Sequence, residues 1–161
     1  MNQEIQSLLY KAEADYLQHQ DLELFQKYIK SLKTRMAVYE FLRDSELQIF
    51  QPIADEMVDT FPNEEQPKIY QMIKNWVSVM RCCGMAMLLN DPDYLKDRLL
   101  DWLAPQVQAD QMQALDRKLF SLLQKKLDQS LVKEQFVLLE PFLKQAQQSL
   151  LESSSTSEAL L

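Results

Sequence analysis

Glycine is almost absent from this chain, which has one glycine in 161 residues. Few positions can therefore take the left-handed backbone of tight hairpins and helix caps. The long stretches rich in Leu, Gln, Glu and Lys favour helix instead. The sequence predicts an all-α fold in a single domain over residues 1–151, a length sufficient to bury a full core.

Histidine and cysteine are also scarce, with one histidine and two adjacent cysteines. His19 falls in the first predicted turn, so haem ligation by a histidine on a core helix is not expected. The adjacent Cys82 and Cys83 do not suit a structural disulfide framework, which indicates a reducing compartment. No further Cys or His is spaced to complete a metal site, so none is expected.

Motifs for catalysis are missing as well. A single glycine cannot build a phosphate-binding loop, and no catalytic triad can be assembled around His19. The carboxylates show no spacing typical of acid–base catalysis. The sequence therefore does not predict an enzyme.

Excess positive charge and long uncharged runs are likewise lacking. A net charge of −7 argues against nucleic acid and against an anionic membrane surface as partners. No uncharged stretch reaches the roughly 20 residues that a membrane-spanning helix needs, and no signal peptide opens the chain. A soluble, cytoplasmic protein without membrane insertion is expected.

The longest strongly apolar run extends from Ile69 to Asp91. Its apolar residues recur at steps of three and four, as in a helix with one buried face; they are Ile69, Met72, Ile73, Trp76, Val77, Met80, Cys83, Met87 and Leu88. Lys74 and Arg81 interrupt the run, so a central core helix is predicted. Whether this helix also holds a ligand stays open.

The other predicted helices surround this one. Residues 3–17 and a second helix capped by Asp21 form an N-terminal hairpin, which buries its apolar face on its own domain or on a partner subunit. Further helix starts are expected at Asp44 or Ser45, at Asp91 with Pro92 in the first turn, at Asp110 and at Ser130. Pro52 is expected to kink its helix or to mark its true start. The Ser-rich residues 152–161 are predicted to be a disordered tail.

Several segments, taken in order, resemble the phycobiliprotein family of the light-harvesting phycobilisome. They are AEADYL (Ala12–Leu17), SLKTRMAVYEFLRD (Ser31–Asp44), FP (Phe61 and Pro62), RCCGMAMLLNDPDYLKDRLLDWL (Arg81–Leu103) and EPFL (Glu140–Leu143). The resemblance runs from about Ala12 to Leu150. It implies a globin-like fold of six helices with an N-terminal helical hairpin, which builds subunit contacts in the family. It also implies phycobilisome or related antenna and assembly proteins as partners, at the cytoplasmic or stromal face of the thylakoid.

The chain departs from the family where the pigment is attached. The family's central helix opens with C-L-R-D, in which Cys bonds the linear tetrapyrrole (bilin) and Asp binds its pyrrole nitrogens. The corresponding positions hold Met72, Ile73, Lys74 and Asn75. Methionine offers no thiolate and asparagine no charge. The Gly-rich loop before this helix is also shortened, to residues 63–68. The resemblance thus implies that the usual bilin site is not intact.

Other residues of the same helix leave a bilin or tetrapyrrole site open. Cys83 lies about three turns beyond Met72 on nearly the same face, as an alternative anchor or as a buried core residue. Lys74 could bind a carboxylate, or simply face solvent. Trp76, with Met80, Met85 and Met87, could form an adaptable pocket or plain core.

A second departure concerns association. The family has Asp and Arg where this chain has Lys11 and Asp15, just before Tyr16. That family Asp pairs across the subunit seam with an Arg that corresponds to Arg81. Lys11 would face Arg81 with like charge, which is unfavourable. The chain is therefore predicted not to enter the ordinary αβ dimer unaltered, and copurification with standard phycobiliprotein subunits would contradict this. Self-association through the hairpin is the alternative.

The sequence thus predicts a non-catalytic phycobilisome-family protein without covalent bilin, in antenna structure, assembly or regulation. One alternative is a divergent light-harvesting subunit that holds a bilin noncovalently or through Cys83. Another is a globin-like sensor or interaction module.

Overall fold

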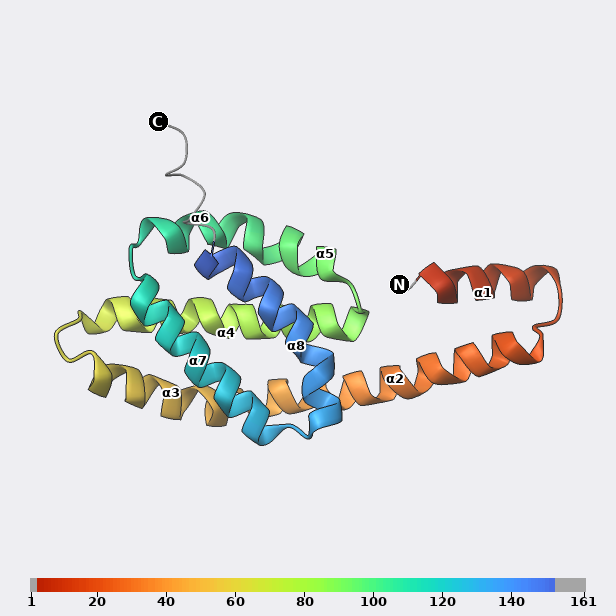
Figure 1. The fold of residues 1–161 in the computed structure, drawn as a ribbon, viewed down its shortest axis with the longest axis horizontal. Coiled ribbons are helices and arrows are strands. Elements are labelled where there is room, and N and C mark those ends of the chain that lie inside the picture. The colour runs from red at the N-terminus through yellow and green to blue at the C-terminus, as the bar shows by residue number, and fades with distance from the viewer. Residues whose placement is uncertain (1–2, 153–161) are drawn as a thin grey trace, which may run out of the picture.

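The computed structural model describes residues 3–152, which are helical almost throughout and include no strand. A hairpin of α1 (Gln3–Ala14) and α2 (His19–Asp44) precedes a body of packed helices (Figure 1). The body contains α3 (Glu46–Thr60), α4 (Gln66–Leu89), α5 (Pro92–Leu95), a π-helical turn η1 (Lys96–Leu100), α6 (Asp101–Ala109), α7 (Gln113–Ser130), α8 (Lys133–Gln147) and a second π-helical turn η2 (Gln148–Glu152). The predicted all-α, globin-like fold is confirmed. Apart from Glu152, the predicted tail lies outside the described residues.

Helix α4 is the centre of the body. It packs against α2, α3, α5, α7 and α8, and Figure 1 shows α7 and α8 crossing it on one side. Val79, Cys83 and Ala86 on this helix are completely buried. The apolar period at Ile69–Asp91 therefore does mark the core, as the sequence predicted.

The end of α4 sets the direction of the next helix. Asn90 takes a left-handed conformation with φ of 51°, which asparagine tolerates better than most residues. Its N–H donates to the Met87 carbonyl at 3.1 Å. The Asp91 carboxylate then accepts the N–H of Asp93 at 3.0 Å and of Tyr94 at 3.3 Å. Asp91 thus caps α5, with Pro92 in the first turn, as predicted.

Three predicted helix starts were wrong. Helix α2 begins at His19, and Asp21 lies one turn inside it, where its carboxylate accepts the Gln18 N–H at 3.0 Å. Asp110 ends α6 instead of starting α7. Ser130 ends α7, because the apolar Leu131 that follows is drawn into the core and separates the two helices. A polar cap residue alone does not fix which of two adjacent helices it serves.

Pro52 does not mark a helix start. Helix α3 begins at Glu46 and continues through Pro52, which lies on the exposed face. There the missing N–H costs one backbone hydrogen bond near solvent.

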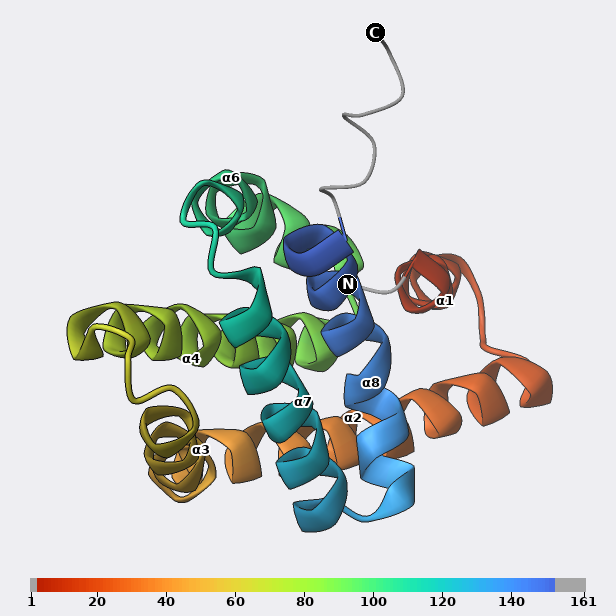
Figure 2. The same ribbon diagram turned by 60° about the vertical axis from the view of Figure 1, so that its left-hand side comes forward.

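The hairpin extends beyond the body. Figures 1 and 2 show the first half of α2 projecting from the packed helices, with α1 folded back along it. Ile5 and Leu8 are the buried residues of α1. The predicted helix over residues 3–17 ends early, at Ala14, and Tyr16 follows it with 91% of its surface exposed. Among the described helices, none is long and apolar enough to cross a membrane.

Candidate functional site

The first half of α4 carries the positions that correspond to bilin attachment. Met72 is buried and Asn75 half-buried, and both line a very small cavity beside Val107, Met112 and Asp116. The cavity measures about 10 Å³. This is about the volume that one water molecule requires. The space beside Met72 is therefore filled by side chains from the α6–α7 region.

Trp76, one turn further along α4, makes the principal polar contact of this region. Its indole Nε1–H donates to Asp116 Oδ1 at 2.7 Å, and its ring lies 5.4 Å from that of Phe120. Trp76 is 1% exposed and Asp116 is 3% exposed. A buried carboxylate with one neutral donor is poorly stabilised in its charged form. Burial accordingly raises the pKa of Asp116 from 3.8 to about 6; the Trp76 hydrogen bond opposes this shift and nearby Asp110 adds to it.

The other candidate ligand residues of α4 do not join this region. Lys74 is exposed, in keeping with the alternative that it simply faces solvent. Cys83 is 0% exposed and its Sγ lies 3.5 Å from the Phe142 carbonyl of α8. Burial raises the pKa of the Cys83 thiol well above its usual range, and neighbouring Cys82 adds to the effect. Met72, Asn75 and Trp76 are thus brought together, while Cys83 packs in the core at another level of the helix.

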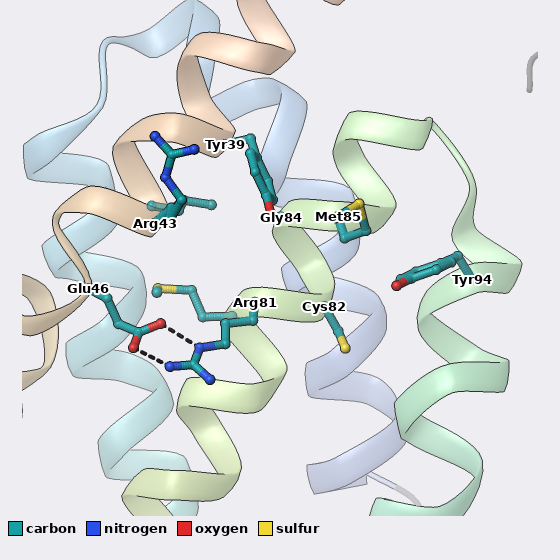
Figure 3. Close-up of a pocket in the computed structure, with 10 residues that line it drawn as sticks. Tyr39, Arg43, Glu46, Arg81, Cys82, Gly84, Met85 and Tyr94 are labelled. Atoms are coloured by element: carbon teal, nitrogen blue, oxygen red, sulfur yellow. Dashed lines mark hydrogen bonds and ion pairs between the residues drawn. The ribbon is translucent and has the colours of Figure 1, made fainter.

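The second half of α4 forms the floor of a pocket of about 420 Å³, between the end of α2 and α5 (Figure 3). Its lining includes apolar and sulfur-containing side chains as well as charged ones: Tyr39, Leu42, Arg43, Glu46, Met80, Arg81, Cys82, Gly84, Met85 and Tyr94. Gly84 allows α2 to pack closely against α4 at this pocket, because a Cβ at this position would lie 3.1 Å from Leu42 Cδ1.

Arg81 lies at one side of this pocket and is paired within the chain. Its Nε and Nη2 donate to the two oxygens of Glu46 at 2.7 and 2.6 Å (Figure 3). The Arg81 hydrogen bond lowers the pKa of the Glu46 carboxyl. This bidentate pair ties the start of α3 to α4 and leaves the guanidinium with a carboxylate partner of its own.

The candidate association residues of the hairpin, Lys11 and Asp15, have their polar contacts within the hairpin. Lys11 Nζ contacts Asp21 Oδ2 at 2.6 Å, which joins α1 to α2. Asp15 Oδ1 accepts the Tyr16 N–H at 2.7 Å in the connection between the helices. Both cations of the predicted like-charge contact, Lys11 and Arg81, therefore have acidic partners within the chain. The prediction about the αβ dimer stays a prediction.

The two cysteines are expected to differ sharply in reactivity. Cys82 is half-buried and lines the pocket beside α5, where burial raises its pKa, while Arg98 lowers it. A maleimide reagent at pH 8 should label Cys82 slowly and leave Cys83 unlabelled, because the thiolate is the reactive form and needs access. Mass spectrometry of digested protein checks this, and in denaturant both should react. Labelling of Cys83 in the folded protein would contradict the burial.

Sequence reasoning missed Asp116 and Arg35. Asp116 falls at a core-facing position of α7, three residues before Leu119 and four before Phe120. A carboxylate on the otherwise apolar face of a helix was the sequence feature that could have indicated a buried polar contact. Arg35, on α2, is buried, donates to the Leu88 carbonyl at 2.9 Å and lies over the Tyr28 ring. It stabilises the C-terminal end of α4, where a cation suits the helix dipole.

The helical body and the projecting N-terminal hairpin place this protein in the class of all-α, globin-like proteins with an N-terminal helical extension. The family model described as phycobilisome protein matches residues 8–114, and the chain belongs to this family. No curated protein matches the chain. Membership links the protein to the light-harvesting antenna, whose members are generally structural, pigment-binding proteins and not enzymes.

Proposed function

We propose that this protein is a non-catalytic member of the phycobilisome family that carries no covalent bilin and serves antenna structure, assembly or regulation through protein contacts. The main support is the packing around Met72 and Asn75, which line a cavity of about 10 Å³. Trp76 and Asp116 bond to each other across the same region at 2.7 Å. A pigment at these positions would have to displace both.

The thiol chemistry supports the same proposal. Covalent attachment needs a reachable thiolate, and Met72 provides none at the attachment position. Cys83 is enclosed in the core and held as a thiol by burial. Cys82 lines a pocket, but burial raises its pKa as well and it lies ten positions beyond Met72. The proposed role is therefore contact with antenna or assembly proteins, at the cytoplasmic or stromal face of the thylakoid.

Coexpression with a bilin-synthesis pathway tests the proposal. The purified protein is expected to be colourless, and denaturing gels stained with zinc should show no fluorescent band. A standard phycobiliprotein subunit with its own attachment enzyme, in the same cells, serves as the positive control. A fluorescent band that disappears in Cys82→Ser or Cys83→Ala would contradict the proposal.

Noncovalent pigment binding is the second candidate function, and one observation favours it. A surface groove of about 480 Å³ lies between the α3–α4 and α6–α7 connections, lined by Pro67, Lys68, Met112 and Leu115 among others. Its lining mixes apolar side chains with the carboxylates of Glu64 and Asp110 and with Lys68, which pairs with Glu65 at 3.5 Å and could bind a propionate in its place. Absorbance that copurifies with the native protein but is lost on denaturation, and that weakens in Lys68→Glu, would favour this function.

A further inference from the structure

The first turn of α7 begins without the usual local support. Gln111, just before the helix, takes a left-handed conformation with φ of 53°, which side chains other than glycine rarely adopt. Met112 occupies the N-cap position and its side chain makes no capping hydrogen bond. The first backbone N–H groups of α7 therefore receive no acceptor from the N-cap side chain. This end of the helix depends on its tertiary contacts.

Two neighbouring side chains, Leu115 and Asp116, hold this turn against the body. They are 7% and 3% exposed. Asp116 Oδ1 accepts the Trp76 indole N–H at 2.7 Å, which ties α7 to α4. The backbone N–H of Asp116 donates to the Met112 carbonyl at 3.0 Å and so closes the first hydrogen bond of the helix. Asp116 is thus the polar anchor of the turn.

The side chains around Asp116 do not compensate a negative charge on it. Met72, Asn75 and Trp76 face it from α4, and all three are uncharged. Asp110, at the end of α6, is a second carboxylate, and its charge disfavours ionisation of Asp116. A carboxylate in this position is costly to ionise while it stays buried.

The cations next to Asp116 on α7 have other surroundings. Arg117 is exposed, and Lys118 pairs with Glu56 of α3 at 3.0 Å. Within residues 3–152, no cation forms an ion pair with Asp116. An ionised Asp116 must therefore reach water to be stabilised.

Met112 lies between Asp116 and solvent. It lines the small cavity beside Asp116, and it also lines the surface groove of about 480 Å³ between the α3–α4 and α6–α7 connections. Displacement of Met112 would join the cavity to the groove and let water reach the carboxylate. Because Met112 directly follows Gln111 and begins the first turn, unwinding of that turn produces this displacement.

We propose that the Trp76–Asp116 contact is a pH-sensitive switch: ionisation of Asp116 releases the first turn of α7 and opens the α6–α7 connection, while the rest of the body stays folded. The closed form holds a neutral, buried carboxyl, and the open form holds a hydrated carboxylate. Burial raises the pKa of Asp116 from 3.8 to about 6 in the closed form. The closed form is therefore favoured at low pH and loses this advantage as the pH rises through about 6. The groove then loses the wall that Met112 and Leu115 provide.

Hydrogen exchange of the full chain, followed by mass spectrometry from pH 5 to pH 8, tests this switch. Rates are corrected for the intrinsic pH dependence of exchange. The protection of amides in residues 110–116 is expected to fall about tenfold over this range, for a pKa of 3.8 in the open form and about 6 in the closed form. Protection that stays unchanged with pH would overturn the proposal.

The dependence of exchange on urea separates local opening from global unfolding. Local opening exposes little surface, so protection of residues 110–116 at pH 8 should hardly change in urea below the unfolding transition. Amides near the completely buried Val79 of α4 should be more protected and should lose protection steeply with urea. If both segments show the same protection and the same urea dependence, Asp116 reaches water only on global unfolding, and the proposal is wrong.

Asp116→Asn is the decisive variant for the switch. Its amide oxygen can still accept the Trp76 N–H but the side chain does not titrate, so the change in protection with pH should disappear. Asp110→Asn is the matched control, since it removes an exposed carboxylate beside the same turn and should keep most of the pH dependence. Circular dichroism must show both variants folded. Persistence of the pH dependence in Asp116→Asn, or its loss in Asp110→Asn, would assign the titration to another group and overturn the proposal.

Discussion

Asp116→Asn is expected to make the protein more stable at pH 8, by about 2–3 kcal/mol, and to leave it nearly unchanged at pH 4. The asparagine Oδ1 can still accept the Trp76 N–H, which contacts Asp116 at 2.7 Å in the native protein. The substitution removes a charge from a site that is 3% exposed. Urea unfolding of both proteins from pH 4 to pH 8 gives the difference directly.

The sign follows from the direction of the pKa shift. In the folded protein the pKa of Asp116 is raised from 3.8 to about 6 by burial. The unfolded chain therefore loses this proton more readily than the folded protein does. The stability that the protonated carboxyl contributes is fully present below pH 3.8, and it is lost as the pH rises through about 6. The advantage of Asp116→Asn should thus appear between pH 4 and pH 7.

Asp110→Asn is the matched control. Asp110 is an exposed carboxylate beside the same region, and its charge contributes to raising the pKa of Asp116. Its removal should lower that pKa slightly and shift the stability of the protein by no more than about 0.5 kcal/mol. If Asp116→Asn is instead less stable at pH 8, the ionised carboxylate and Trp76 form a net favourable pair, and the expectation is wrong.

Helices could be predicted well from this sequence, as could the junction at Asp91, but several other junctions could not. The period of α4 identified both the element and its buried face, because a step of three or four is a property of the helix alone. The starts of α7 and α8 depended on tertiary packing. Gln111 takes φ of 53° between α6 and α7, and Leu131 is buried between α7 and α8. Neither fact can be read from the polar residues near these junctions.

Some features of the candidate site could likewise be predicted from the sequence, whereas others depend on tertiary packing. Loss of the attachment chemistry at Met72 and Asn75 could be read from residue types alone. The closure of the surrounding space could not, because it depends on α7 bringing Asp116 to Trp76 from forty positions away. For Cys83, helical spacing near the face of Met72 left two interpretations open, an anchor or a core residue. The structure buries Cys83 completely and places its Sγ against the Phe142 carbonyl of α8, as the second interpretation expects.

Trp76→Phe is expected to destabilise the protein by about 1–3 kcal/mol at pH 8 and by less at pH 5. Phenylalanine retains most of the ring packing against Phe120 but removes the donor on which Asp116 depends. That hydrogen bond lowers the pKa of Asp116, so its loss raises this pKa further. The folded protein then holds its proton to a higher pH, and the added cost of ionisation grows as the pH rises.

Trp76→Ala removes the ring packing together with the donor. Loss of a completely buried tryptophan is expected to cost about 3–5 kcal/mol from packing, a large part of the stability of a typical domain. The pH-dependent cost of the lost donor should add to this as in Trp76→Phe. Trp102→Phe is the control, since Trp102 is half-exposed and donates only to the Arg98 carbonyl at 2.8 Å. In the double variant Trp76→Phe/Asp116→Asn, the extra pH dependence of Trp76→Phe should disappear, because no titrating group remains. If the extra pH dependence persists in the double variant, a titrating group other than Asp116 causes it. The Trp76–Asp116 hydrogen bond would then not explain the pH dependence of stability.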